Sequence, residues 1–481
     1  MEVVSKATQF THRVAAHCKG RNFTYGDLLK HSSWVSQKLL GSRSDLNNER
    51  VVFITPQSYE YLPCQWGIWR AGGVAVPLCT QHPPPEWEYI IQNSEASAVV
   101  CHSSYYSSLQ PLCKGVKLIP LEDFVPGEGS AQEVFVTSDL ERPALMIYTS
   151  GTTGKPKGVV STHRNLSSQV KALVEVWKWQ EDDHILEVLP LHHVHGIMCV
   201  LACANFAGAR VTFNSKFDQA RVWEEFMEKD LNMFMAVPTI YNRLIDEWNN
   251  FGEDMQKKAY QACERFRLMV SGSMALPEPM LDKWHRVSGH TLLERYGMTE
   301  CGMILSNPYK GKRKPGCVGF PLPEVEVKLD QGELCVKGPN VFKRYFNNPK
   351  ATEEAFDQEG WFKTGDIAEV DSEGYFKLLG RASVDIIKTG GYKVSALDIE
   401  QTLLSHPSIS EVNVVGVPDE DWGQVIGVVL KSNQTIKLED LQEWSKQRLA
   451  VYKVPRKLIQ LQEIPRNQMG KVNKKELVKL F

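Results

Sequence analysis

The sequence predicts an α/β protein with a large N-terminal domain of parallel-rich sheets with crossover helices and a small α+β domain at the C-terminal end. Short apolar runs alternate with amphipathic helical patterns through residues 1–380, which is typical of parallel strands joined by helices. The pattern changes near Gly380 and Arg381. The chain of 481 residues also exceeds the length at which one hydrophobic core stops growing.

The expected elements follow the hydrophobic pattern along the chain. Strands are expected at 50–54, 98–100 and 144–147 in the large domain, and at 412–417 and 427–430 in the small domain. Helices are expected at 24–40, from Glu86 after a proline run, from His163, and at 217–229, 397–404 and 438–449. We expect the domains to span 1–380 and 386–481, with a hinge at 381–385.

Composition and charge exclude several classes of protein. The hydrophobic content of 42%, charged content of 23% and net charge of −2 are ordinary for a globular chain and argue against a nucleic-acid binder. No apolar window is long enough for a transmembrane helix, and the N-terminus lacks a signal-peptide run or an Arg-rich presequence. The eleven cysteines have no zinc spacing, so a reducing compartment is expected.

The segment from Tyr148 to Gly158 combines glycines, hydroxyls and lysines directly after an apolar run. Glycines let backbone N–H groups turn toward an anion, and hydroxyls and lysines add donors and charge. It is not a Walker A loop, because Thr149 stands where that motif has glycine. A mobile surface loop is the alternative. We predict that it holds the ATP phosphates through Thr149, Ser150, Gly151, Thr152, Thr153, Gly154 and Lys155.

Four further motifs share the sequence with this loop. They are Ser271-Gly272-Ser273, Glu294-Arg295-Tyr296-Gly297-Met298-Thr299-Glu300, Lys363-Thr364-Gly365-Asp366 with the later Arg381, and Met469-Gly470-Lys471. Taken one by one they have plainer readings: turns, a helix cap, a surface aspartate and a solvated basic tail. Taken together they resemble the AMP-forming acyl-activating superfamily, which includes acyl-CoA synthetases, adenylation domains and luciferases.

The resemblance implies a role for each motif in ATP binding. Thr299 would hydrogen-bond the α-phosphate, and Glu300 would bind Mg²⁺ as a hard carboxylate ligand. Asp366, with Arg381 beside it, would hold the ribose hydroxyls. Lys471 would stabilise the charge that develops during adenylation. The adenine side would be formed by Gly272 and Ser273, and the nucleotide-binding set also includes Glu294, Tyr296 and Gly297.

The resemblance also implies a rotation of the small domain between two half-reactions. One extra residue between Arg381 and Lys388, compared with many superfamily members, leaves the hinge residue open between Ser383 and Asp385. After rotation, Gly390 and Gly391 would line the coenzyme A tunnel, where a side chain would obstruct the thiol.

The acyl pocket is expected to contain a positive charge. Arg295 stands where many relatives with hydrophobic substrates carry glycine, and a guanidinium in a small pocket is costly unless an anion pairs with it. We therefore predict a short dicarboxylate substrate, held by Arg295 with His193, His195 and Ser271. Alternatively, Arg295 forms a structural ion pair with Glu294. Arg243 and Arg313 are secondary candidates.

Within the superfamily, residues 189–196, 237–243, 294–300 and 382–393 resemble the malonyl-CoA synthetase family, most closely its animal mitochondrial branch. The short connection 328–332, Met274 and Glu278 depart from it. The resemblance implies malonate, ATP and coenzyme A as substrates, Mg²⁺ as cofactor, methylmalonate as a second substrate, and the mitochondrial matrix, with the cytosol as alternative. Three rivals stay open: a synthetase for acetate or acetoacetate, a carrier-loading module and an inactive nucleotide binder. Monomer and dimer are both open.

Overall fold

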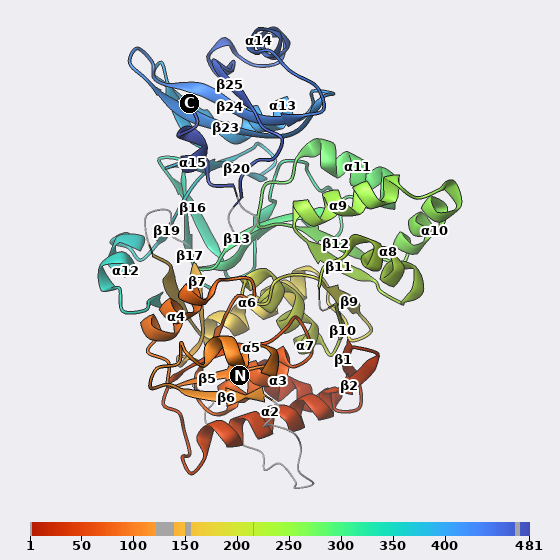
Figure 1. Ribbon diagram of the computed structural model, residues 1–481, viewed down its shortest axis with the longest axis vertical. Coiled ribbons are helices and arrows are strands. Elements are labelled where there is room, and N and C mark those ends of the chain that lie inside the picture. Colours follow the sequence, from red (N-terminus) through yellow and green to blue (C-terminus); the bar gives the residue numbers. More distant parts are fainter. Residues whose placement is uncertain (1, 122–138, 150–154, 215, 467–471) are drawn as a thin grey trace.

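The computed structural model describes residues 2–481 except 122–138, 150–154, 215 and 467–471. It has an adenylate-forming ligase fold, with a large N-terminal α/β part and a small C-terminal part drawn in blue at the top of Figure 1. Four sheets organise the described residues. The proposed boundaries at 380 and 386 remain predictions.

The first large sheet has seven strands in the order β18-β8-β7-β4-β3-β5-β6. Its core is parallel, because β4 pairs with β3 and β7, and β5 pairs with β3 and β6, in the same direction. At the other edge, β8 pairs with β7 and β18 in the antiparallel sense. The strands are β3 (Arg50–Ile54), β4 (Val74–Pro77), β5 (Ala98–Cys101), β6 (Lys117–Pro120), β7 (Pro143–Thr149), β8 (Lys157–Thr162) and β18 (Arg344–Tyr345).

The second large sheet has nine strands in the order β15-β14-β13-β12-β11-β9-β10-β1-β2. The run from β13 to β1 is parallel, and antiparallel strands close both ends: β14 and β15 at one end and β2 at the other. The strands are β1 (Val14–Cys18), β2 (Arg21–Thr24), β9 (His184–Glu187), β10 (Arg210–Phe213), β11 (Met233–Ala236), β12 (Leu268–Ser271), β13 (Leu293–Met298), β14 (Gly302–Ser306) and β15 (Phe320–Pro321).

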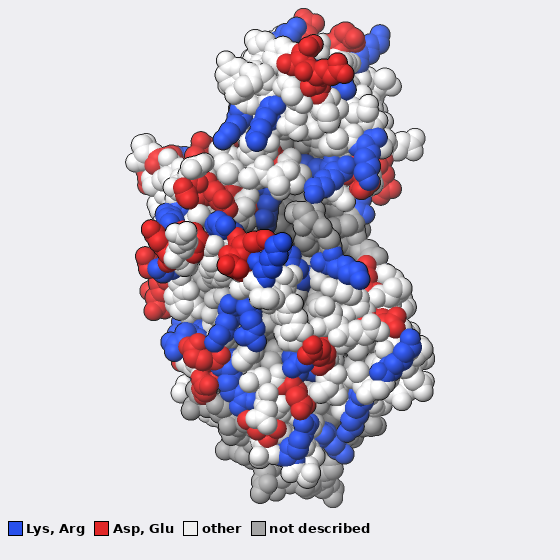
Figure 2. Space-filling model, turned by 90° about the vertical axis from the view of Figure 1, so that its left-hand side faces the viewer, with Lys and Arg blue, Asp and Glu red and all other residues white. Residues whose placement is uncertain are grey.

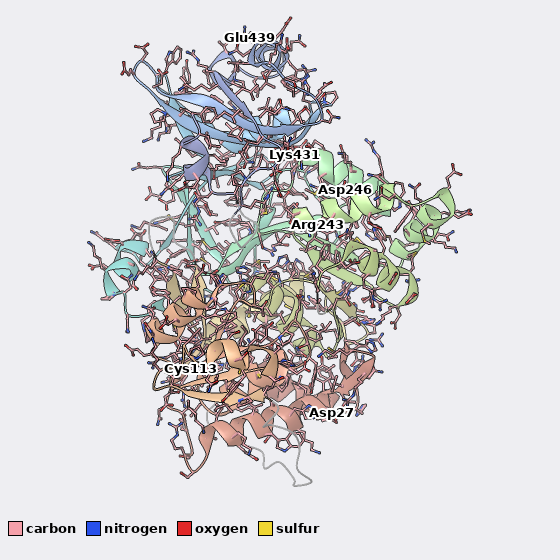
Figure 3. The ribbon with its side chains drawn as sticks, in the orientation of Figure 1. Asp27, Cys113, Arg243, Asp246, Lys431 and Glu439 are labelled. Atoms are coloured by element: carbon pink, nitrogen blue, oxygen red, sulfur yellow. The ribbon has the colours of Figure 1, made fainter. Side chains whose placement is uncertain are left out.

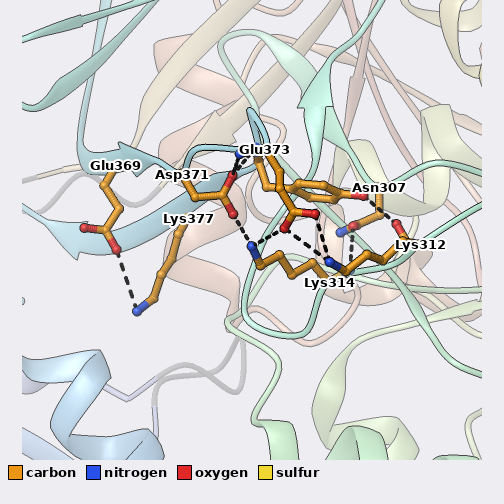
Figure 4. A network of polar contacts seen from close by, with 8 residues as sticks. Asn307, Lys312, Lys314, Glu369, Asp371, Glu373 and Lys377 are labelled. Carbon is orange, nitrogen blue, oxygen red and sulfur yellow. Dashed lines mark hydrogen bonds and ion pairs between the residues drawn. The ribbon is translucent and has the colours of Figure 1, made fainter.

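A four-stranded antiparallel sheet separates these sheets from the small C-terminal part (Figure 1). It contains β16 (Glu326–Asp330), β17 (Glu333–Lys337), β19 (Phe362–Val370) and β20 (Phe376–Arg381). Lys314, beyond β14, pairs with Asp371 and with Glu373 at 2.8 Å in the β19–β20 turn (Figure 4). The ion pairs tie the antiparallel sheet to the nine-stranded one. The expectation of strand–helix alternation up to residue 380 is wrong here, because consecutive hairpins need no crossover helix.

The small C-terminal part contains a five-stranded sheet that begins just after β20. A long antiparallel pair, β23 (Ile409–Asp419) and β24 (Gly423–Ser432), forms its centre, and β25 (Lys457–Gln460) joins β24 in parallel. The β21 (Ile386–Thr389) and β22 (Tyr392–Ser395) hairpin completes it. One face packs on α13 (Ala396–Leu403) and α14 (Leu438–Lys446), and the other on Leu477 of α15 (Lys474–Val478).

Helices cover the large sheets, and their starts match local signals. Thr24 caps α2 by accepting from the Asp27 N–H, and Thr162 caps α6 in the same way with Asn165. The helix expected from Glu86 begins earlier, at Pro84, because proline suits the first helical turn. The helices are α1 (Glu2–Ala7), η1 (Thr8–Phe10), α2 (Tyr25–Leu40), α3 (Tyr61–Arg70), α4 (Pro84–Asn93), α5 (Ser103–Leu109), α6 (His163–Val176), the π-helix η3 (His195–Ala202), α7 (Cys203–Ala207), α8 (Gln219–Glu228), α9 (Pro238–Asn249), α10 (Glu253–Cys263), α11 (Glu278–Ser288), α12 (Pro349–Ala355) and η4 (Val451–Lys453).

The surface carries mixed charge, and the cysteines lie in the core. On the face shown in Figure 2, acidic and basic side chains are interspersed without a large field of one sign. All eleven cysteines are buried. Among the described residues, no helix combines the length and apolar character that crossing a bilayer requires.

Candidate active site

The candidate acyl site lies where parallel strands of the nine-stranded sheet end. Ser271 is the last residue of β12 and stands opposite Glu294 on β13. Arg295 follows on β13, and His195 begins the π-helix η3. Ligands in open α/β sheets bind outside the carboxyl ends of the strands, and π-helical turns are frequent at functional sites. The structure therefore brings together three of the four residues predicted to bind the acyl group.

The Arg295 side chain is buried without an anion. The residue is 3% exposed, and its Nε and Nη2 atoms have no hydrogen-bond partner among the described residues. Burial lowers the pKa of this guanidinium. A buried charged group that lacks a partner is strongly unfavourable, so this arrangement points to a missing negative charge.

Two neutral polar groups accompany Arg295. Burial, followed by the charge of Arg295, keeps the pKa of His195 well below its ordinary value, so the imidazole is neutral. Its Nδ1 lies 3.4 Å from Ser273 Oγ, while its Nε2 has no partner among the described residues. Ser271 Oγ is also buried and without a partner there. These atoms could hydrogen-bond the same anion.

Gly272 provides the space that the guanidinium occupies. A Cβ at this position would lie 2.5 Å from Arg295 Cζ and 2.6 Å from its Nε, which is closer than real contacts allow. The sequence suggested Gly272 as a place where the adenine base approaches the backbone. The structure adds a second reason for glycine, which is the close approach of Arg295.

The described structure does not support the alternatives to Arg295 as the anion-binding group, which were an ion pair with Glu294 and anion binding by Arg243 or Arg313. Arg295 Nε and Nη2 and Glu294 Oε2 all lack a partner among the described residues, because adjacent residues on a strand point to opposite faces. Arg313 donates to the carbonyls of Thr291, Pro308 and Tyr309. Arg243, labelled on α9 in Figure 3, is exposed. Its guanidinium lies over the Phe217 ring. We therefore do not assign either of these arginines to the acyl site.

Glu294 faces the predicted adenine-side loop. Its Oε1 accepts a long hydrogen bond of 3.4 Å from the Leu276 N–H, and its Oε2 has no partner among the described residues. Burial raises the pKa of this carboxyl to about 8, against the lowering effect of the Leu276 hydrogen bond. The raised pKa favours the protonated form of this side chain. Its assignment to nucleotide binding remains a proposal.

The raised pKa of Glu294 predicts that ionisation of this side chain destabilises the folded protein at high pH, and that Glu294→Gln removes this effect. Between the ordinary value of 4.5 and about 8, the folded state binds more protons than the unfolded state, so stability falls as pH rises. Glutamine cannot ionise. We expect equal melting temperatures for the variant and the parent at pH 4, below both pKa values, and a higher one for the variant at pH 8.5. A difference independent of pH would contradict this prediction.

Asp366 and Arg381 face each other across the β19–β20 pair. Arg381 Nε lies 2.9 Å from Asp366 Oδ1, and Tyr296 donates its hydroxyl hydrogen bond to Asp366 Oδ2. Burial raises the pKa of Asp366, against the lowering effects of Arg381 and Tyr296. The three residues predicted from separate motifs therefore meet, with Asp366 held in a fixed orientation.

Glu300 lies in the turn between β13 and β14, next to Thr299. Its Oε1 accepts a 2.9 Å hydrogen bond from the Tyr345 hydroxyl, and its Oε2 accepts no hydrogen bond from the described residues. An oriented carboxylate with one oxygen available suits a hard cation such as Mg²⁺. Tyr345 was missed by the sequence reasoning, because no local pattern connects β18 to this turn.

The predicted phosphate loop is described at its two ends. Thr149 ends β7 and pairs with Lys157 at the start of β8, while Lys155 lies over the Tyr89 ring at 5.5 Å. Ser150, Gly151, Thr152, Thr153 and Gly154 lie outside the described residues. We expected the loop to lead to the helix at His163. Instead, the strand β8 comes before that helix and pairs with β7 in the antiparallel sense.

The remaining predicted residues belong to the small part and its junction. Gly390 and Gly391 form the turn of the β21–β22 hairpin with φ of 53° and 84°, which glycine adopts without strain. Ser383 is exposed, whereas Asp385 is largely buried and hydrogen-bonded. Lys471 lies outside the described residues. His193 is partly buried, with its ring 4.0 Å from that of His192.

Comparison with known proteins gives consistent matches over the whole chain. Residues 3–346 match the family described as AMP-binding enzyme, and residues 398–471 match its C-terminal domain. The malonate–CoA ligase ACSF3, mitochondrial, of Xenopus laevis is 45% identical, covering 100% of this chain and 92% of the relative. ATP-bound MatB from Rhodopseudomonas palustris has a TM-score of 0.91 at 32% identity, covering 100% of this chain and 98% of that chain.

A third relative is less similar in overall structure. A malonyl-CoA ligase ternary product complex with methylmalonyl-CoA and AMP bound has a TM-score of 0.69 at 32% identity, covering 95% of this chain and 97% of that chain. The described structure is therefore more similar as a whole to the ATP-bound relative than to this product complex, at equal sequence identity.

Proposed function

Because this chain belongs to the AMP-binding enzyme family, we propose that it is an AMP-forming malonate–CoA ligase. In the first step, one malonate carboxylate attacks the α-phosphate of ATP, forming malonyl-adenylate and releasing pyrophosphate. In the second step, the thiol of coenzyme A attacks the acyl carbon, and AMP leaves. Full-length likeness to malonate–CoA ligases supports this reaction.

The observation that carries the choice of malonate is the unpaired guanidinium of Arg295. The second carboxylate of a short dicarboxylate would pair with Nε and Nη2, and His195 Nε2 and Ser271 Oγ would donate to it. A bidentate charge-assisted pair is among the strongest polar contacts in proteins. A monocarboxylate of the same size leaves Arg295 unpaired and buried. Methylmalonate should also bind, since one methyl changes binding by about 1–3 kcal/mol.

The nucleotide would lie between the two large sheets and the antiparallel sheet. Asp366 would accept from the ribose hydroxyls in the orientation that Arg381 and Tyr296 impose. The loop between Thr149 and Lys155 would hold the β- and γ-phosphates, and Thr299 the α-phosphate. The Glu300 carboxylate fits Mg²⁺, which supplies charge neutralisation on the phosphates. These assignments are inferred from family motifs and the geometry described above.

A pyrophosphate-release screen across C2–C6 mono- and dicarboxylates, with ATP, Mg²⁺ and coenzyme A, tests the proposal. We expect malonate to give the highest kcat/KM, exceeding acetate and acetoacetate by about 10³ or more, because those acids leave Arg295 without its anion. Consumption of free coenzyme A must accompany pyrophosphate release. A preference for a monocarboxylate would exclude the malonate assignment, and release without coenzyme A consumption would favour a carrier-loading module.

The cellular location follows from the relatives alone. The Xenopus, mouse, cattle and human relatives are all named as mitochondrial enzymes. We propose the mitochondrial matrix for this protein. Immunogold labelling or import assays with the native gene product would test this location.

A further inference from the structure

A buried ionic cluster joins the hinge region to the C-terminal segment. Lys474 Nζ lies 2.6 Å from Asp385 Oδ1 and 2.7 Å from Glu400 Oε1. The side chains of Lys474, Asp385 and Glu400 are 11%, 15% and 13% exposed. Burial alone would lower the pKa of Lys474, but the charges of Glu400 and Asp385 outweigh it and raise that pKa. The ammonium therefore stays charged at neutral pH.

Asp385 extends this cluster beyond the small sheet. Its Oδ2 accepts a 3.0 Å hydrogen bond from the Arg381 backbone N–H. Gly380 permits this approach, because a Cβ there would lie 2.4 Å from Asp385 Cβ. The Arg381 side chain in turn pairs with Asp366 at 2.9 Å. A continuous polar path thus runs from the predicted ribose site, through the hinge, to Lys474.

Lys474 also lies at the base of the segment that carries Lys471. Arg466 and Val472 form an isolated antiparallel bridge on either side of residues 467–471, and Arg466 pairs with Glu411 of β23. On the Val472 side, the Lys474 ion pairs are followed by Leu477, which is buried against β23 and β24. The two ends of the segment are therefore fixed, one of them by the cluster that contains the hinge carboxylate.

We propose that Lys474 is a positioning residue for the adenylation step, because it ties the segment that bears Lys471 to the hinge carboxylate of Asp385. This inference rests on the proposed function. The ion pair of Lys474 with Glu400 would be enough to hold Lys474 against the small sheet, because Glu400 Oε1 also accepts a 2.7 Å hydrogen bond from the Val414 N–H of β23. The second pair, with Asp385, connects Lys474 to the junction at Arg381. Loss of this pair should misplace the Lys471 segment in the arrangement that resembles the ATP-bound relative.

The experiment separates the two half-reactions in Lys474→Met, Lys474→Arg and Glu400→Gln. Malonate-dependent ATP–pyrophosphate exchange reports adenylation, and free thiol released from malonyl-CoA with AMP reports the second step in reverse. We expect Lys474→Met to lower exchange about 100-fold, since small misplacements of reacting groups cost that much, and thiol release by less than about threefold. Lys474→Arg should restore exchange to within about threefold, because a guanidinium can bind both carboxylates.

Glu400→Gln is the matched control, because it alters the same buried cluster but keeps the Lys474–Asp385 pair. It should leave the ratio of the two half-reactions at the parental value. Lys474→Met leaves two buried carboxylates without a cation. If it does not fold, Lys474→Met/Glu400→Gln replaces it, with the same split expected. Parallel losses in both half-reactions that follow the melting temperature would overturn the proposal. A parent protein without malonate-dependent exchange would instead contradict the proposed function.

Discussion

Arg295→Met is expected to abolish malonate turnover while making the folded protein more stable. The second carboxylate of malonate loses its bidentate partner, so kcat/KM for malonate should fall by about 10³–10⁴. The same substitution removes a buried cation whose Nε and Nη2 have no partner among the described residues. Methionine fills similar space without a charge, so the melting temperature should rise by a few degrees. Steady-state kinetics and calorimetry without ligand measure the two effects.

A substitution that lowers activity but raises the melting temperature identifies an arginine that binds substrate. Replacing a structural arginine lowers the melting temperature instead. Arg313→Met provides the control, since the Arg313 guanidinium donates to three backbone carbonyls. Its removal should lower the melting temperature and leave the preference for malonate over propionate unchanged. Unaltered malonate turnover in Arg295→Met would remove the basis for the substrate assignment. The family membership and the adenylation chemistry would stand.

Local signals predicted much of the fold. The strand at Arg50–Ile54, the helix expected at 24–40 and the start of α6 at His163 are confirmed, because each depends on residues within one turn or one strand. The fold class and the family are also confirmed. The small part was predicted in the same way, and its strands β23 and β24 are longer than expected, since their pairing extends beyond the apolar residues.

Long-range pairing limited the rest of the prediction. The β8 strand and the antiparallel β16–β20 sheet depend on registers between distant segments, which hydrophobic periodicity does not specify. For the same reason, neither the contact of Tyr345 with Glu300 nor the space that Gly272 leaves for Arg295 was predicted. The sequence alone indicated that Arg295 needs an anionic partner, because an unpaired guanidinium in a small pocket is unfavourable. Its surroundings required the structure.

Lys471→Ala is expected to stop adenylation and spare the second half-reaction. Negative charge develops between the attacking carboxylate and the α-phosphate, and removal of one group that stabilises such charge costs about 10²–10³ in rate. Malonate-dependent ATP–pyrophosphate exchange should therefore fall by about that factor. Thiol release from malonyl-CoA with AMP should stay within about threefold of the parental rate, because in the second step the lysine segment is expected to have left the site.

Lys475→Ala tests whether charge at one position, rather than a basic tail, produces this effect. Lys475 is exposed in the same cluster of lysines and is not assigned to binding or catalysis. If the tail acted as a diffuse cationic patch, each alanine variant would weaken exchange to a similar, salt-dependent extent. If Lys471 alone meets the developing charge, Lys475→Ala keeps parental exchange at every salt concentration. Equal effects of the two variants would show that Lys471 acts only as part of a solvated basic tail. The predicted specific role of Lys471 in adenylation would then be wrong.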